Sequence, residues 1–175
     1  MTDKYINGLD KIYLNLLNPY IDIPISLLEI GVFEGYSLLM FEKMLPKASI
    51  YGIDIHCPTL IDSKVVMREI NQNDSESLEK FAGEVGGFDI IIDDGSHFTK
   101  ETKNCFDTLW KYTRKLYVIE DWAIAFAYDL GYYRMYRDRV IGMDNLVLQI
   151  PIRFEDISSI EIVYNKKHSY AVYGR

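Results

Sequence analysis

Long apolar runs, paired cysteines and an excess of basic residues are all missing from this sequence. No apolar run approaches the ~20 residues of a bilayer-spanning helix, so no membrane partner is expected. The cysteines, Cys57 and Cys105, form no CxxC or zinc-ligand pattern and are predicted to be reduced thiols. With 19 Lys and Arg against 26 Asp and Glu, the net charge is −7. This charge argues against a nucleic-acid-binding surface, because phosphate neutralisation needs clustered basic side chains.

Two phosphate-binding signatures and a secretory leader are also absent. The chain contains neither the dinucleotide motif G-x-G-x-x-G nor a phosphate loop ending in Gly-Lys-Ser/Thr. Its first residues lack a basic segment followed by an apolar one, so we expect no signal peptide and a cytoplasmic location. A length of 175 residues, 49% of them hydrophobic, predicts a single domain over 1–175 with its own core.

Apolar strand patterns alternate with helical ones along most of the chain. Strands are expected at residues 25–31, 48–54, 65–70, 88–92, 115–119, 159–164 and 169–174. Helices are expected at residues 2–18, 38–45, 76–84 and 99–112, with partial helical patterning at 133–149. The alternation indicates an α/β fold with a mainly parallel sheet that closes with a β-hairpin.

The first strand leads into a glycine-punctuated turn and a helix. Gly31 permits a tight turn, Gly35 follows it, and Ser37 is a candidate cap for the helix. The second strand ends at Asp54, about 20 residues further on, where a carboxylate reaches ribose hydroxyls in this topology. Together the turn and the acid predict a nucleoside-type ligand, although either feature alone is equally typical of an ordinary strand-to-helix connection.

A polar segment, 71–74, follows the third strand. Asp74 is expected to cap the next helix, whereas Gln72 is balanced between a structural role and a contact with a purine edge.

Adjacent acids end the next two strands. Asp93 and Asp94 precede a glycine, a serine and His97, and Glu120 and Asp121 end the fifth strand. Carboxyl ends of parallel strands meet at one edge of a sheet, so these acids can form an oxygen-rich site for Mg²⁺. The alternative is that they only turn the chain and cap helices.

Aromatic residues are concentrated at 123–136. They can line a substrate pocket, form part of the core or form a partner interface.

These motifs resemble those of a known family. LEIGVFEGYS at 28–37 and GID at 52–54 resemble the first two motifs of class I S-adenosylmethionine (SAM) methyltransferases. IDDGSH at 92–97 and IED at 119–121 resemble the metal-dependent sugar O-methyltransferases of the macrocin and mycinamicin type, with rhamnosyl O-methyltransferases and the cephalosporin hydroxylase family as relatives. The resemblance covers residues 27–121 and implies a Rossmann-like seven-stranded sheet in the order 3-2-1-4-5-7-6, with strand 7 antiparallel.

The resemblance also implies roles for individual residues. Asp94, Glu120 and Asp121 match the family's Mg²⁺ ligands, and His97 matches its general base. The SAM-binding positions that it implies are Glu29, Gly31, Gly35, Ser37, Asp54, Gln72 and Asp93. Two positions depart from the family pattern, since Asn71 replaces an acid and Tyr36 replaces the second glycine of a Gly-Gly-Ser turn.

The implied activity is Mg²⁺-assisted methyl transfer from SAM to a hydroxyl of a small molecule, a sugar or another vicinal diol. Macrolide enzymes of this family are longer than this chain, so the identity of the acceptor is left open. The oligomeric state is also left open, and a homo-oligomer is possible. Three alternatives remain: a methyltransferase without a metal, a SAM-binding subunit without catalysis, and a nucleotide-dependent enzyme on the same frame.

Overall fold

A computed structural model describes residues 4, 9–121, 159–164 and 169–175 of the protein. Seven strands form one sheet in the order β3-β2-β1-β4-β5-β7-β6. The strands are β1 (Ser26–Ile30), β2 (Ser49–Asp54), β3 (Val66–Glu69), β4 (Phe88–Asp93), β5 (Thr113–Glu120), β6 (Ser159–Tyr164) and β7 (Ser169–Gly174). The first five are parallel, and β7 runs antiparallel to both β5 and β6. The predicted strand order and the antiparallel seventh strand are confirmed.

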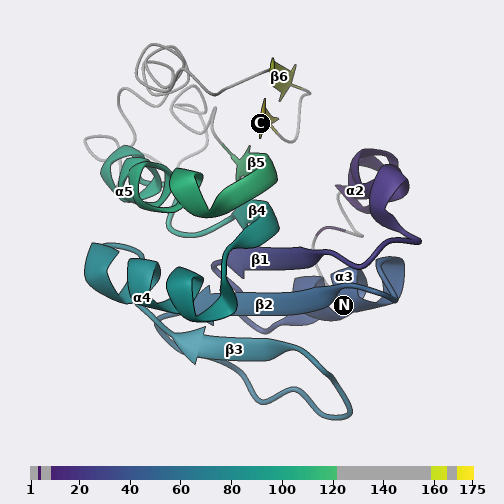
Figure 1. The fold of residues 1–175 in the computed structure, drawn as a ribbon, viewed down its shortest axis with the longest axis horizontal. Helices are drawn as coiled ribbons and strands as arrows, with labels where there is room; N and C mark the ends of the chain where they lie inside the picture. The colour runs from purple at the N-terminus through teal and green to yellow at the C-terminus, as the bar shows by residue number, and fades with distance from the viewer. Residues whose placement is uncertain (1–3, 5–8, 122–158, 165–168) are drawn as a thin grey trace, which may run out of the picture.

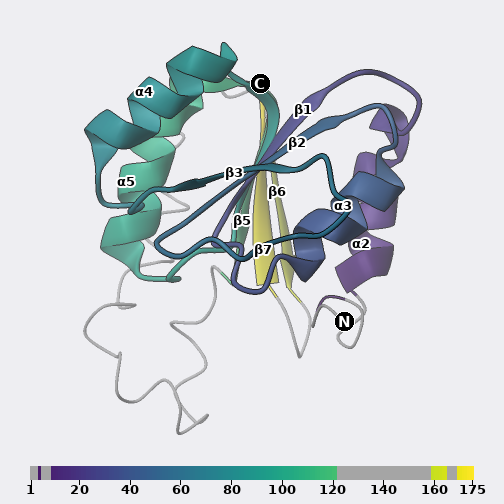
Figure 2. The same ribbon diagram turned by 90° about the horizontal axis from the view of Figure 1, so that it is seen from below.

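Helices cover both faces of this sheet (Figures 1 and 2). The α-helices are α2 (Leu9–Leu17), α3 (Tyr36–Met44), α4 (Ser75–Val85) and α5 (Thr99–Leu109), and the short 3-10 helices are η1 (Asn18–Tyr20) and η2 (Trp110–Tyr112). Helices α4 and α5 lie on one face, and α2 and α3 lie on the other. The central strands therefore face apolar helices on both sides, which explains their near-continuous apolar sequences.

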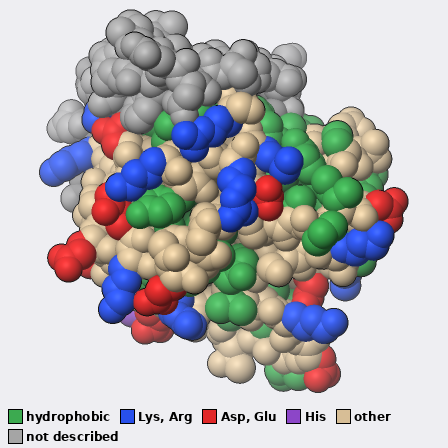
Figure 3. Space-filling view, in the orientation of Figure 1, with side chains coloured by type: hydrophobic (Ala, Val, Ile, Leu, Met, Phe, Trp, Pro, Cys, Tyr) green, Lys and Arg blue, Asp and Glu red, His purple; other side chains and the backbone are tan. Residues whose placement is uncertain are grey.

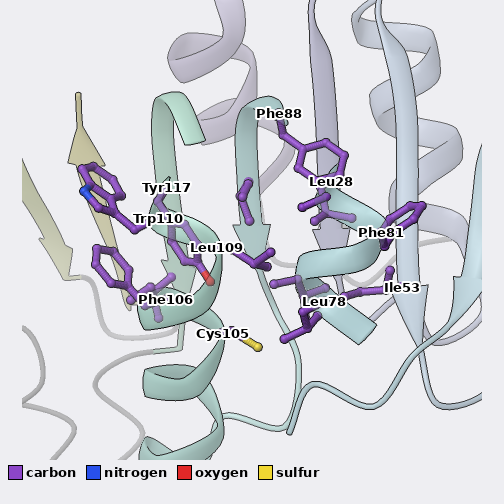
Figure 4. Close-up of a cluster of buried hydrophobic side chains, with 14 of the residues drawn as sticks. Leu28, Ile53, Leu78, Phe81, Phe88, Cys105, Phe106, Leu109, Trp110 and Tyr117 are labelled. Carbon is purple, nitrogen blue, oxygen red and sulfur yellow. The ribbon is translucent and has the colours of Figure 1, made fainter. Parts of the chain in front are cut away.

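Each face of the sheet has its own apolar core. Under α4 and α5, the ring of Phe106 stacks on Trp110 and packs against Tyr117 and Tyr173 (Figure 4). Under α2 and α3, Tyr13 packs edge-on against Phe41, with ring centroids 5.0 Å apart. Burial of these side chains stabilises the sheet and holds the carboxyl ends of its strands in place.

The structure differs from the expected elements in a few places. Helix α3 begins at Tyr36, after a left-handed Gly35, and no side chain caps it, so the prediction that Ser37 caps this helix is wrong. Asp74 caps α4 as predicted, since its side chain accepts a hydrogen bond from the backbone N–H of Ser77. The predicted helix 99–112 ends as α5 at Leu109 and continues as η2. The predicted helical patterning at 133–149 and the aromatic segment 123–136 lie outside the described residues.

On the face shown in Figure 3, basic, acidic and apolar side chains are interspersed. Cys57 and Cys105 are free thiols. Within the described ranges, no helix has both the length and the hydropathy needed to cross a membrane.

Candidate active site

A pocket of about 900 Å³ opens at the carboxyl ends of the parallel strands. Its wall includes seven of the predicted site residues: Gly31, Ser37, Asp54, Gln72, Asp94, His97 and Asp121. Four others lie outside the wall: Glu29, Gly35, Asp93 and Glu120. The fold thus brings the glycine turn and three of the six predicted acids, Asp54, Asp94 and Asp121, to a single cavity.

The turn after β1 requires glycine at position 31. Gly31 has a φ of +84°, and a Cβ there would overlap the carbonyl oxygen of Asp94 and lie 2.6 Å from the Cα of Gly95. The Gly31 N–H donates to Ile53 O (2.9 Å), and the Asp94 N–H donates to Ile30 O (2.9 Å). The turn is therefore held between β2 and β4, with its backbone exposed to the pocket.

Asp54, at the end of β2, stabilises this turn through hydrogen bonds. Its Oδ2 accepts hydrogen bonds from the backbone N–H groups of Val32 (2.9 Å) and Phe33 (3.0 Å). Its Oδ1 accepts one from the N–H of His56 at 3.3 Å. A carboxylate has about four acceptor sites, so Asp54 keeps capacity for a hydroxyl donor in the pocket.

Gln72 brings an amide donor to the same cavity. Its Oε1 accepts a hydrogen bond from the Ser96 N–H (2.9 Å), and its backbone carbonyl accepts one from Asn104 Nδ2 (2.8 Å). Its Nε2 is buried and has no hydrogen-bond partner among the described residues. A buried donor without a partner costs about 1–3 kcal/mol, so this position suits a ligand that offers an acceptor, such as a purine nitrogen.

Glu29 is fully buried behind the turn. Ser37 Oγ donates to its Oε2 at 2.6 Å, which explains why Ser37 turns inward rather than capping α3. Burial raises the pKa of Glu29 from its ordinary 4.5 to about 8, although the nearby Lys4 ammonium opposes this shift. Glu29 therefore carries a proton at neutral pH and supports the turn from behind.

Asp94, His97 and Asp121 meet at the other side of the pocket. One ligand atom from each residue lies within 4.8 Å of the others. His97 Nε2 is 4.0 Å from Asp94 Oδ1 and 3.9 Å from Asp121 Oδ2. Two carboxylates with an imidazole suit a hard divalent ion such as Mg²⁺, which prefers oxygen ligands.

The backbone around this cluster is strained. His97 has a φ of 58° and Asp121 a φ of 50°, in the left-handed region that non-glycine residues rarely adopt. Such conformations cost about 1–3 kcal/mol each and are concentrated at functional sites. In this case they direct an imidazole and a carboxylate toward Asp94.

The remaining predicted metal ligand, Glu120, has partners that sequence reasoning missed. Glu120 Oε1 accepts hydrogen bonds from Lys4 Nζ and from the Tyr13 hydroxyl, both at 2.5 Å. Lys4 Nζ also donates to Asp94 Oδ2 at 2.7 Å. Lys4 and Tyr13 lie more than 100 residues before Glu120, on a segment read only as an amphipathic helix, and no motif in the sequence marks them.

Asp93 and Gly35 support the site from behind. Asp93 is buried and accepts hydrogen bonds from the Tyr117 hydroxyl (3.2 Å) and the Gly95 N–H (3.4 Å). Burial raises the pKa of Asp93 to about 7. Gly35 precedes α3 in a left-handed conformation and packs against Leu60 and Pro58, where a Cβ would lie 2.8 Å from the Leu60 side chain.

Comparison with known proteins places this geometry in context. No family model matches the chain. The mycinamicin VI 2''-O-methyltransferase of Micromonospora griseorubida is 38% identical over 58% of this chain and 28% of that protein. The demethylmacrocin O-methyltransferase of Streptomyces fradiae is 35% identical over 55% of this chain and 27% of that protein. The chain is a relative of these sugar O-methyltransferases.

Solved structures agree with this relationship. The MycE methyltransferase of mycinamycin biosynthesis, in complex with Mg, SAH and mycinamycin VI, matches 94% of this chain with 28% identity and a TM-score of 0.74. A putative caffeoyl-CoA O-methyltransferase from Staphylococcus aureus, 14% identical with a TM-score of 0.66, shares the fold. The fold is that of class I SAM methyltransferases. The chain spans less than a third of the length of the curated relatives and 49% of the MycE chain.

Proposed function

We propose that this protein transfers a methyl group from SAM to a hydroxyl of a small molecule, assisted by Mg²⁺. The observation that carries the proposal is a single pocket lined both by Gly31 and Asp54 and by the Asp94, His97 and Asp121 cluster. The first pair suits a nucleoside with an amino-acid tail, and the cluster suits a cation beside a base. Methyl transfer from SAM with metal assistance requires both sets of groups at a short distance from each other.

The nucleoside side of the pocket offers contacts along the whole length of SAM. Asp54 is proposed to accept hydrogen bonds from the ribose hydroxyls, and Gln72 Nε2 to donate to the adenine. Gly31 lines the same pocket, and its backbone is proposed to lie against the methionine portion. Ser37 lines the cavity and donates to Glu29, and Glu29, Gly35 and Asp93 support these groups from outside the wall. SAM itself supplies an electrophilic methyl group on a sulfonium.

The acid side of the pocket is proposed to activate the acceptor. Asp94, Glu120 and Asp121 are the proposed ligands of a divalent cation, which supplies a Lewis acid that lowers the pKa of a nearby hydroxyl. His97 lies 3.9–4.0 Å from two of these carboxylates and is proposed to take the hydroxyl proton on its imidazole. The protein then contributes alignment of the acceptor oxygen with the methyl group.

The proposed acceptor is a sugar or another vicinal diol. Two neighbouring hydroxyls present the pair of oxygens that a hard cation binds best. The relative from Micromonospora griseorubida is named for 2''-O-methylation of mycinamicin VI. Because the chain matches less than a third of each relative, we propose the class of acceptor and not a particular compound.

Calorimetric titration of SAM into protein stripped with EDTA, with and without added Mg²⁺, tests the proposal. We expect SAM to bind in both conditions and Mg²⁺ to bind the wild type but not Asp94→Ala. With labelled SAM and diol-bearing glycosides, His97→Ala is expected to lose at least about 100-fold in rate, the usual contribution of a general base. Absence of SAM binding would refute the proposed function. Full activity of His97→Ala would refute the proposed role of His97 as the general base.

A methyltransferase without a metal is the second candidate, and one observation favours it. Lys4 Nζ forms ion pairs with both Asp94 and Glu120 in this structure, so these carboxylates share a cation partner that belongs to the protein itself. An unchanged rate of methyl transfer in the presence of EDTA would support this second candidate.

A further inference from the structure

A buried ammonium group lies among the acids of the proposed metal site. Lys4 is 2% exposed, and its Nζ lies 2.5 Å from Glu120 Oε1, 2.7 Å from Asp94 Oδ2 and 3.6 Å from Glu29 Oε1. The ammonium also lies 5.6 Å from the centroid of the Tyr13 ring. One positive charge thus faces three acidic side chains that come from β1, β5 and the loop after β4.

This arrangement keeps Lys4 charged. The ammonium is paired with Glu120 at 2.5 Å and with Asp94 at 2.7 Å, and these ion pairs keep it in its charged form. Removing an ammonium from water is costly unless carboxylates pair with it. The crowded carboxylates are in turn destabilised without a cation, because their negative charges repel one another. Lys4 and these acids therefore stabilise each other.

The same carboxylates are the proposed ligands of the divalent ion. Lys4 takes Oδ2 of Asp94 and Oε1 of Glu120, whereas Oδ1 of Asp94 faces His97. A divalent ion shared by Asp94, Glu120 and Asp121 would lie next to the ammonium and be repelled by it. Each cation therefore weakens the binding of the other to these carboxylates.

We propose that the Lys4 ammonium and a divalent cation compete for Asp94 and Glu120, so that Lys4 holds these acids in the metal-free protein and leaves them when the cation binds. This inference rests on the proposed metal site. It makes Lys4 a positioning residue that sets the affinity of the site: the acids stay in place without metal, and the cation binds more weakly than it would otherwise.

Binding of Mn²⁺ to EDTA-stripped wild type and Lys4→Met, followed by calorimetry, tests the competition. Methionine keeps the length and apolar stem of the side chain and removes the charge. We expect Lys4→Met to bind Mn²⁺ at least about tenfold more tightly, which is about 1.4 kcal/mol. Lys111→Met serves as the control, because the ion pair of Lys111 with Glu79 is exposed and remote from the pocket. This control is expected to bind as the wild type does.

A second measurement uses the wild type alone, in case Lys4→Met folds poorly. Pulse acetylation followed by mass spectrometry is expected to leave Lys4 unlabelled without metal and to label it when Mg²⁺ is added. Equal or weaker Mn²⁺ binding by Lys4→Met, or continued protection of Lys4 with Mg²⁺ bound, overturns the competition alone. Absence of Mn²⁺ binding by both proteins overturns the metal site and the competition together. The SAM titration described above tests SAM binding independently of this result.

Discussion

The two sides of the pocket are built in different ways. On the nucleoside side, Asp54 is held by the backbone N–H groups of Phe33 and Val32, 21 and 22 residues away. On the acid side, Asp94 and Glu120 are held by a buried ammonium 90 and 116 residues away. The nucleoside side is thus a turn held by hydrogen bonds to backbone N–H groups, whereas the acid side depends on ion pairs between residues far apart in the sequence. We expect substitutions on the acid side to change stability and those on the nucleoside side to change the turn or ligand binding.

The largest expected effect is the pH dependence contributed by Glu29. Because burial raises its pKa from 4.5 to about 8, the folded protein keeps a proton there that the unfolded chain loses. Stability therefore falls as the pH rises from about 5 to 8, by about 4 kcal/mol from this group. Glu29→Gln removes this pH-dependent contribution. The difference in unfolding free energy between the variant and the wild type should therefore shift in favour of the variant as the pH rises from about 5 to 8. Urea denaturation at pH 5.5 and 8.5 measures the change, and parallel pH profiles would contradict it.

Gly31→Ala tests the turn that separates the two sides. The left-handed backbone and the overlap with Asp94 and Gly95 are expected to cost about 2–4 kcal/mol of unfolding free energy and to abolish SAH binding. Gly83→Ala is the matched control, since Gly83 lies within α4 and a Cβ there has nothing within 4 Å. This control should be neutral or stabilise the protein by about 0.5–1 kcal/mol. Similar unfolding curves for the two variants would show that the turn tolerates a side chain.

Tyr13→Phe tests the charge balance on the acid side. The variant keeps the ring contact with Phe41 but removes the hydroxyl that donates to Glu120, so we expect a loss of about 1.5–3 kcal/mol in urea denaturation. SAH affinity should be unchanged, because Tyr13 does not line the pocket. Tyr36→Phe, at the exposed start of α3, is the control and should unfold like the wild type. A loss of SAH affinity without a loss of stability in Tyr13→Phe would break the distinction between the two sides.

Asp54→Asn should give the smallest change in stability and a selective change in binding. The amide oxygen can still accept hydrogen bonds from the turn, but the charge that favours hydroxyl donors is lost. We expect SAH to bind about tenfold more weakly, or about 1.4 kcal/mol by calorimetry. A fall in the urea midpoint as large as that of Tyr13→Phe would show that Asp54 mainly serves the fold.

Much of the fold could be read directly from residue patterns. The strand expected at 88–92 is present as β4, and its three consecutive isoleucines, Ile90, Ile91 and Ile92, are fully buried, as is typical of a strand covered on both faces. The boundaries of the helices were less predictable, because local contacts decide them. Ser37 is a common cap residue, but the buried Glu29 offers its hydroxyl a stronger partner, so the side chain turns inward.

Sequence by itself determined which chemical groups reach the carboxyl edge of the sheet. Strand periodicity places Gly31, Asp54, Asp94 and Asp121 there, because the ends of parallel strands share one edge. Only the tertiary structure decided how the charges are balanced. Lys4 and Tyr13 approach Glu120 from across the chain, and His97 and Asp121 adopt left-handed backbones that no local pattern predicts. The physical reason is that a buried carboxylate requires a partner, and the partner can come from any segment that the fold brings close.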